Sequence, residues 1–168
     1  ESWNMCQDFA KSHNNIFAFR TTQRAGGPLR GREIGIQEAK GEWITFIDGD
    51  DYVSPKYIEH LLEATKEGTY DIAVTGHARA YSDGRVENFL WDDYSQTTSQ
   101  RLSTFFGHFI DQNYYTDPTD TVGQNLVRMS IAKATDLSLY PNKIWAEDTL
   151  MALAFLANSK NGVNFVDH

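Results

Sequence analysis

The chain has little cysteine, no long apolar run and no excess of basic residues. Each absence excludes or disfavours a class of protein: disulfide-linked, membrane-spanning or nucleic-acid-binding. The single cysteine, Cys6, excludes an internal disulfide and fits a reducing compartment. No run of about 18 apolar residues occurs, so the sequence predicts no transmembrane segment. With 23 acidic against 15 basic residues the formal net charge is -8, which disfavours nucleic acid as a partner.

The length and composition of the chain suit one folded domain. The chain has 168 residues, of which 40% are hydrophobic and 13% aromatic, enough to build a packed core. Helix-like and strand-like segments alternate along it, which is typical of a layered α/β domain. We therefore expect a single domain over residues 1–168.

Apolar spacing and chain-breaking residues predict the order of elements. Helices are expected over residues 2–13, 30–40, 98–111 and 147–157, and another is expected to be capped by Ser54, with Pro55 in its first turn, and ended by Gly68. Strands are expected over 16–19, 43–47, 71–75 and 163–166, with a hairpin over 81–90. Residues 126–133 fit either a strand or a helix, and residues 113–121 are expected to form a loop.

The most informative feature is a group of acids at the end of a predicted buried strand. Residues 43–47 run directly into Asp48, Gly49, Asp50 and Asp51. Ligands of open α/β sheets bind beyond the carboxyl ends of the strands, and strand alternation predicts that Asp48 and Asp50 point the same way. Gly49 would let the backbone turn and a ligand come close. Paired carboxylates of this kind suit Mn²⁺ or Mg²⁺.

A metal at this position would suit the cleavage of a sugar–diphosphate bond. Diphosphate oxygens could fill the coordination positions that the carboxylates leave open, and the cation would stabilise charge on the departing nucleotide. The alternative is a solvated turn, in which Asp and Gly are common. Three adjacent acids repel one another unless a cation joins them, which favours the metal site.

Three motifs, in this order, resemble those of family 2 glycosyltransferases. Residues 41–55, GEWITFIDGDDYVSP, resemble the family's central motif, and residues 26–35, GGPLRGREIG, resemble its glycine-rich loop and helix start. Residues 146–149, AEDT, resemble its Glu-Asp motif. The resemblance covers nearly the whole chain. It implies a GT-A type fold, a Rossmann-like three-layer α/β sandwich with a mixed central sheet, and inverting transfer of a sugar from a nucleotide-diphosphate donor to an acceptor hydroxyl.

The resemblance also implies roles for the acids and for one arginine. Asp50 would be the metal ligand, Asp48 would assist the metal or contact the donor, and Gly49 and Asp51 would support the same site. Arg32 would lie near the donor phosphates or near the acids that support them. The alternative for Arg32 is a solvated helix residue with an ion-pair partner such as Glu38.

Asp148 would be the general base that removes the acceptor proton, with Glu147 beside it. An inverting displacement needs one carboxylate near the acceptor hydroxyl, opposite the leaving phosphate, which agrees with this role. The alternative is that both acids only complement the dipole of a helix that starts there.

The resemblance further implies the partners. They are Mn²⁺ or Mg²⁺, a nucleotide-diphosphate sugar, with a UDP-sugar preferred, and a glycan or lipid-linked acceptor in bacterial surface polysaccharide synthesis. The expected location is cytoplasmic, either free or peripheral at the inner face of the membrane. The family's first strand, which binds nucleotide, and its carboxyl-terminal continuation are expected to lie outside this chain, which would make it a fragment.

Two departures keep other functions open. Glu33 stands where the family has Asn, and residues 122–126, VGQNL, lack a family lysine. They leave open a non-catalytic module of the same fold that binds nucleotide or glycan. A metal-dependent phosphohydrolase with Asp48 as nucleophile is a further alternative, because a buried strand followed by Asp-x-Asp also opens that family's motif.

Histidines and exposed aromatic residues add less. No metal-ligand spacing relates His13, His60, His77, His108 and His168, which are expected at the surface or in the core. His77 follows a strand and could approach the ligand. Four aromatic residues could instead stack on an acceptor sugar or anchor the core and loops: Trp91, Tyr114, Tyr115 and Trp145.

Overall fold

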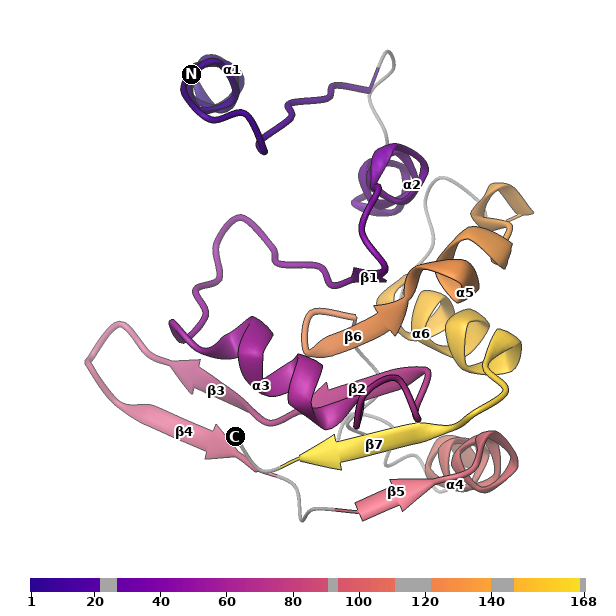
Figure 1. Ribbon diagram of the computed structural model, residues 1–168. Coiled ribbons are helices and arrows are strands. Elements are labelled where there is room, and N and C mark those ends of the chain that lie inside the picture. Colours follow the sequence, from indigo (N-terminus) through magenta and orange to yellow (C-terminus); the bar gives the residue numbers. More distant parts are fainter. Residues whose placement is uncertain (22–26, 91–93, 111–121, 140–146, 167–168) are drawn as a thin grey trace.

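The computed structural model describes residues 1–21, 27–90, 94–110, 122–139 and 147–166. Within these residues it is a mixed α/β fold with a five-stranded mixed sheet in the order β1-β6-β2-β7-β5 and a separate two-stranded hairpin, β3-β4 (Figure 1). The strands are β1 (Trp43–Ile44), β2 (Ile72–Thr75), β3 (His77–Ala80), β4 (Val86–Phe89), β5 (Tyr94–Gln96), β6 (Asn125–Arg128) and β7 (Val163–Val166). The helices are α1 (Ser2–Ser12), α2 (Leu29–Glu38), α3 (Tyr57–Ala64), α4 (Thr98–Ile110), α5 (Met129–Ala134) and α6 (Glu147–Asn158), with a 3-10 turn over Leu137–Leu139.

The centre of the sheet is a parallel pair, β2 and β7, in which every residue is buried. Strands buried on both faces read as continuous apolar runs, as IAVT and VNFV largely do. β6 runs antiparallel to both β1 and β2, and β5 runs antiparallel to β7. The pairing of β1 with β6 brings the segment after β1 to the edge of the buried sheet.

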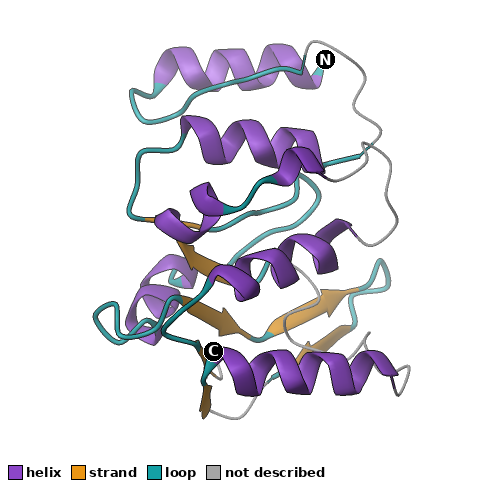
Figure 2. Cartoon of the chain, turned by 90° about the vertical axis from the view of Figure 1, so that its right-hand side faces the viewer, coloured by secondary structure: helices purple, strands orange, loops and turns teal. Residues whose placement is uncertain are grey.

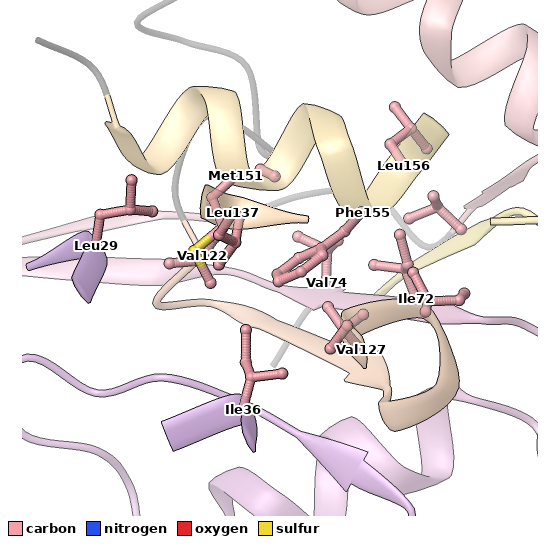
Figure 3. Close-up of a cluster of buried hydrophobic side chains, with 14 of the residues drawn as sticks. Leu29, Ile36, Ile72, Val74, Val122, Val127, Leu137, Met151, Phe155 and Leu156 are labelled. Atoms are coloured by element: carbon pink, nitrogen blue, oxygen red, sulfur yellow. The ribbon is translucent and has the colours of Figure 1, made fainter. Parts of the chain in front are cut away.

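Helices cover both faces of this sheet, so the fold has three layers (Figures 1 and 2). The larger core cluster joins α2, α5 and α6 to one face and contains Ile72, Val74, Phe155 and Phe165 (Figure 3). The smaller cluster joins α3 to the other face through Leu61 and residues such as Ala73. The alternation of Ile72 and Val74 with Ala73 follows from the two-residue period of a strand. The expected layered α/β fold with a mixed sheet is confirmed.

The expected strand over residues 16–19 is wrong. These residues are outside any helix or strand, and Phe17 is 68% exposed. The preceding helix α1 has no buried residue and lies apart from the sheet (Figures 1 and 2). An apolar run becomes a strand only when a neighbour satisfies its backbone groups, and the described residues offer this run no pairing partner.

Several boundaries also differ from expectation. The strand expected over 43–47 is assigned only at Trp43–Ile44. Helix α3 begins at Tyr57, and Ser54 accepts a backbone hydrogen bond from Tyr57 at 3.1 Å without capping the helix through its side chain. The ambiguous stretch contains both forms, β6 followed directly by α5. A hairpin that turns around Asp83 and Gly84 is present, but its strands are 77–80 and 86–89, so it begins four residues before the expected range of 81–90. The expected loop over 113–121 lies outside the described residues.

No helix in the described part of the chain combines the length and apolarity that crossing a bilayer requires.

Asp71, at the start of β2, joins three separate parts of the fold. Its Oδ2 accepts hydrogen bonds from the backbone amides of Lys160 and Asn161, both at 2.9 Å. Its Oδ1 accepts from Arg128 Nε at 2.9 Å and from Asn161 Nδ2 at 3.1 Å. Burial raises the pKa of this carboxyl, but these hydrogen bonds lower it by more, so the pKa of Asp71 lies below its ordinary value. The charged form is therefore part of the folded structure.

We expect Asp71→Ala to lower the free energy of unfolding by roughly 3 kcal/mol, because Arg128 and two backbone amides would lose their buried partner. Urea unfolding at neutral pH measures this loss. Asp83→Ala, which removes an exposed carboxylate hydrogen-bonded to Arg85 within the same turn, is the control and should shift the midpoint far less.

The contribution of the Asp71 carboxylate to the free energy of unfolding should decrease as the pH falls. Because its folded pKa is lowered, its contribution to stability is complete above the ordinary Asp pKa and is lost as pH falls through the folded value. The stability difference between the parent and Asp71→Ala should therefore shrink on acidification. A difference that grew at low pH would contradict this assignment.

Candidate functional site

The acidic segment after β1 forms a turn. Asp51 donates its backbone N–H to the Asp48 carbonyl at 3.1 Å, so the extended alternation expected for Asp48 and Asp50 does not continue through it. The two side chains have different surroundings: Asp48 is hydrogen-bonded to Arg32, while Asp50 lines a groove together with Asp51. Gly49 leaves space at the turn, since a Cβ there would meet no atom within 4 Å.

Arg32 links two of the predicted acids from separate elements. It lies on α2 and is 8% exposed. Its Nη2 donates to Asp48 Oδ1 at 3.0 Å, and its Nη1 donates to Asp148 Oδ1. Asp148 is the second residue of α6 and Glu147 the first, so the Glu-Asp pair opens a helix as expected. The fold thus brings α2, the end of β1 and the start of α6 together around one guanidinium.

The alternative partner for Arg32, Glu38, is not the one observed. The ion pair along the surface of α2 is instead formed by Arg30 and Glu33, with Nη1 and Oε2 2.6 Å apart. Glu33, the departure from the family pattern, is therefore neutralised locally by its neighbour on the same helix.

Charge and burial set the proton affinities in this cluster. Burial opposes the charge on Arg32, but the hydrogen bonds and charges of Asp148 and Asp48 outweigh it, so the pKa of Arg32 is raised. Burial also raises the pKa of Asp148, Arg32 lowers it in part, and the negative charges of Asp48 and Glu147 raise it further. The net pKa of Asp148 lies above its ordinary value. A carboxylate in this state binds a proton more readily than a free one does.

A groove of about 970 Å³ lies next to Asp50 and Asp51. Its walls come from the segment that follows β1, from the start of α3, from the end of β2, from the residues just before β6 and from the β3–β4 hairpin. The lining residues include Ile47, Tyr52, Val53, Tyr57, His77, Ala78, Ala80, Asn88, Leu90 and Gln124. The groove opens where β2 ends, which is the edge at which ligands of α/β sheets bind.

Hydrogen bonds of Tyr57 and His77 hold the groove walls in place. Tyr57 donates its hydroxyl to the Gly123 carbonyl at 2.8 Å and lies 3.0 Å from the Thr45 hydroxyl, which ties α3 to β1 and to the segment before β6. His77 Nδ1 lies 2.9 Å from Gln124 Oε1, and its ring stacks on Phe89 with centroids 4.7 Å apart. His77 lines the groove, and its approach to a ligand stays a prediction.

Asp50 is the acid whose surroundings best fit a hard cation. It is exposed at the groove, and within the described chain no hydrogen bond or ion pair engages its carboxylate. The described residues contain no group of three or more His, Cys, Asp or Glu side chains arranged to hold a metal. A divalent ion here would have one or two protein carboxylates and would need oxygens from a substrate, as Mg²⁺ sites often do.

The structure does not describe some of the residues that were expected near the site. Trp91, Tyr114, Tyr115, Trp145 and His168 are outside the described residues, as is the side chain of His108. Among the described residues, the sequence did not point to Tyr57, Asn88 or Gln124 as groove residues. Tyr57 reaches the groove from α3, Asn88 from the hairpin and Gln124 from the segment before β6, and no local motif marks any of them.

The chain matches known proteins over most of its length. The family model described as "Glycosyl transferase family 2" matches residues 1–134. The glycosyltransferase EpsJ of Bacillus subtilis strain 168 is 36% identical over 85 residues, covering 51% of this chain and 24% of that protein. The poly(ribitol-phosphate) beta-glucosyltransferase of Bacillus spizizenii is 32% identical over 73 residues, covering 44% of this chain and 12% of that protein.

Solved structures show the same fold. The crystal structure of S. aureus TarS 1-349 in complex with UDP-GlcNAc superposes with a TM-score of 0.67 at 17% identity, covering 96% of this chain and 43% of that chain. The TarS 1-349 complex with UDP gives a TM-score of 0.65 at 18% identity, covering 96% of this chain and 44% of that chain. This chain thus spans less than half of the length of these proteins.

Replacing Arg32 tests the geometry of the charged cluster. Arg32→Gln removes the cation that lowers the pKa of Asp148, so that pKa should rise further above its ordinary value. Stability should fall by about 2 kcal/mol, because two carboxylates lose a charged hydrogen bond. Carbon-13 NMR titration of the carboxyl groups and urea unfolding measure the two effects.

Arg30→Gln is the matched control, since Arg30 lies on the same helix and pairs with Glu33. This variant should leave the pKa of Asp148 unchanged. An Asp148 pKa that fell or stayed constant in Arg32→Gln would show that the guanidinium does not hold this carboxylate.

Proposed function

Because the chain belongs to glycosyl transferase family 2, we propose that it transfers a sugar from a UDP-sugar to an acceptor hydroxyl with inversion at the sugar carbon. The observation that carries this proposal is the pair of hydrogen bonds from Arg32 to Asp148 and Asp48. They hold Asp148 close to the turn after β1, where Asp50 lines the groove. An inverting transferase needs these two elements, a base for the acceptor and a site for the leaving diphosphate.

Two comparisons support a uridine nucleotide as the leaving group. TarS, whose fold this chain shares, has been crystallised with UDP-GlcNAc and with UDP. In this chain the acids Asp50 and Asp51 line the groove at the sheet edge, where the turn after β1 brings them. We assign the diphosphate to this end of the groove.

A divalent cation, Mn²⁺ or Mg²⁺, would be held by Asp50, with Asp51 or Asp48 in support. When bound, it would neutralise the charge that develops on the departing diphosphate. The protein places the Asp50 carboxylate there, where the described residues form no competing hydrogen bond with it. It also keeps Asp48 in its ion pair with Arg32. Asp48 would support the cation from the position in which Arg32 holds its carboxylate.

Asp148 would act on the acceptor. Its raised pKa favours proton uptake from a hydroxyl whose oxygen forms a bond to the sugar carbon while the bond from that carbon to the diphosphate breaks. The proton ends on Asp148, and the electron pair of the broken bond leaves with the diphosphate. Arg32 orients the carboxylate through Oδ1 and so limits its rotation. Glu147, next in the chain, adds negative charge that supports protonation.

The biological setting is inferred from relatives. Curated proteins with matching segments include the poly(ribitol-phosphate) beta-glucosyltransferase and the minor teichoic acid biosynthesis protein GgaB of Bacillus subtilis strain 168. We extend this setting to the present chain as synthesis of a bacterial surface glycan, on a glycan or lipid-linked acceptor. A cytoplasmic location, either free or at the inner face of the membrane, completes the proposal.

Family membership favours this function over the phosphohydrolase. That alternative requires Asp48 as a nucleophile, whereas its carboxylate is engaged by Arg32. A non-catalytic module of the same family would bind UDP but would not turn over a donor.

We expect Asp50→Ala to weaken UDP binding in the presence of Mn²⁺ by about tenfold or more, because the cation would lose its protein carboxylate. Isothermal titration calorimetry of UDP with and without Mn²⁺ measures this. Asp83→Ala, an exposed acid in the hairpin turn, is the control and should bind as the parent does. UDP affinity that is independent of both Mn²⁺ and Asp50 would contradict the assigned site.

Asp148→Asn should separate binding from chemistry. The change keeps the shape of the side chain and removes the base, so turnover should fall on the order of 10²- to 10⁴-fold. UDP affinity should stay within about twofold of the parent, since Asp148 is not assigned to the donor phosphates. Release of UDP from a panel of UDP-sugars, read by a coupled assay, checks turnover. Equal turnover in parent and variant would rule out Asp148 as the base.

A further inference from the structure

The groove continues from the acids to the β3–β4 hairpin, beyond the residues that the donor chemistry uses. Its hairpin end is lined by Ala78 and Ala80 of β3 and by Asn88 of β4. Ala78 and Asn88 are registered partners, so they project from the same face of the hairpin. The small alanine side chains leave this face of the hairpin open to a ligand.

The hairpin end presents an amide and a guanidinium in different surroundings. The Asn88 side chain is exposed, and the described residues form no hydrogen bond with its amide. Arg79 also contributes to the wall, but its guanidinium is engaged by the ring of Phe89, 5.6 Å from the centroid.

The segment after β1 gives the groove an exposed apolar wall. Tyr52 follows the acids directly and is 79% exposed, and Ile47 and Val53 present further exposed apolar surface. Leu90, which follows β4, adds exposed apolar surface on the hairpin side. A tyrosine ring combines a broad apolar face with a polar hydroxyl, which favours recognition of ligands that have both characters. A sugar ring is such a ligand, with C–H groups on its faces and hydroxyls at its edge. Asn88, which lines the same groove, can bind such hydroxyls through both its N–H and its C=O groups.

From this arrangement we propose that the hairpin end of the groove binds an uncharged sugar residue of the acceptor, stacked on Tyr52 and hydrogen-bonded by Asn88. The inference rests on the proposed function, because the acceptor hydroxyl must approach a donor sugar beside Asp50. The groove volume of about 970 Å³ lies at the upper end of the range for small-molecule sites, which leaves room for an acceptor residue next to a donor.

Saturation-transfer difference NMR tests this site directly. The probes are methyl β-glucopyranoside and methyl N-acetyl-β-glucosaminide as uncharged sugars, with ribitol 5-phosphate as a charged comparison, each added to protein with UDP and Mn²⁺. Saturation should pass to the sugar protons of the uncharged glycosides. The signal should fall on the order of five- to tenfold in Tyr52→Ala and in Asn88→Ala, and Tyr52→Phe should retain it.

Glu87→Ala is the matched control, since Glu87 lies on β4 next to Asn88 and projects from the other face, where it accepts a hydrogen bond from Tyr81. Both test residues are exposed, so their variants should fold, and circular dichroism checks this. No saturation of either glycoside by the parent protein, or equal saturation in Tyr52→Ala, would overturn the proposal. So would a stronger signal from ribitol 5-phosphate that is lost in Arg79→Ala.

Calorimetry with UDP separates this inference from the proposed function. Tyr52→Ala and Asn88→Ala should bind UDP with Mn²⁺ as the parent does, whereas Asp50→Ala should not. Normal UDP binding with no glycoside signal would reject the acceptor site alone. If, in addition, UDP binding depended neither on Mn²⁺ nor on Asp50, the transferase assignment would be rejected as well.

Discussion

The two hydrogen bonds from the buried Arg32 guanidinium to Asp48 and Asp148 determine how the rest of the site is arranged. An arginine fork can hold two carboxylates in fixed directions, and its charge offsets the repulsion between them. Its partners are 116 and 16 residues away along the chain, so the link exists only once the sheet and its covering helices are folded. The geometry of the site is therefore a consequence of tertiary packing.

That packing is anchored in the parallel pair β2 and β7. Both strands are buried throughout, and the larger core cluster fixes α2 and α6 on one face of the sheet. Asp71 secures the start of β2 to the turn before β7 and to Arg128 at the end of β6. Since α2 carries Arg32 and α6 carries Asp148, the same core that stabilises the domain also sets the distance between the cluster's parts. The groove side is held separately, by Tyr57 and by the His77–Gln124 pair.

The sequence predicted most of the elements and the three motifs, because apolar periodicity and turn residues are local signals. It placed the acids after a strand and Asp148 at a helix start, and the structure has both. The strand expected over 16–19 failed because strand formation depends on a partner that local sequence does not specify. The parallel orientation expected for Asp48 and Asp50 failed for a related reason: the backbone turns after Asp48, which apolar alternation in the preceding strand does not reveal. Gln124 was missed because the long-range pairing of β6 with β1 and β2 brings it to the groove. Asn88 was missed because no local signal shows which face of the hairpin meets the groove.

The central claim is that Asp50 holds the cation of the leaving diphosphate while Asp148, fixed by Arg32, faces the acceptor. A crystal structure of the protein with UDP and Mn²⁺, with anomalous diffraction recorded at the manganese edge, tests it most directly. The account predicts one anomalous peak about 2.1 Å from an Asp50 carboxylate oxygen and from diphosphate oxygens, with Asp148 still bound to Arg32. A peak remote from Asp50, or UDP bound on another face of the molecule, would contradict it.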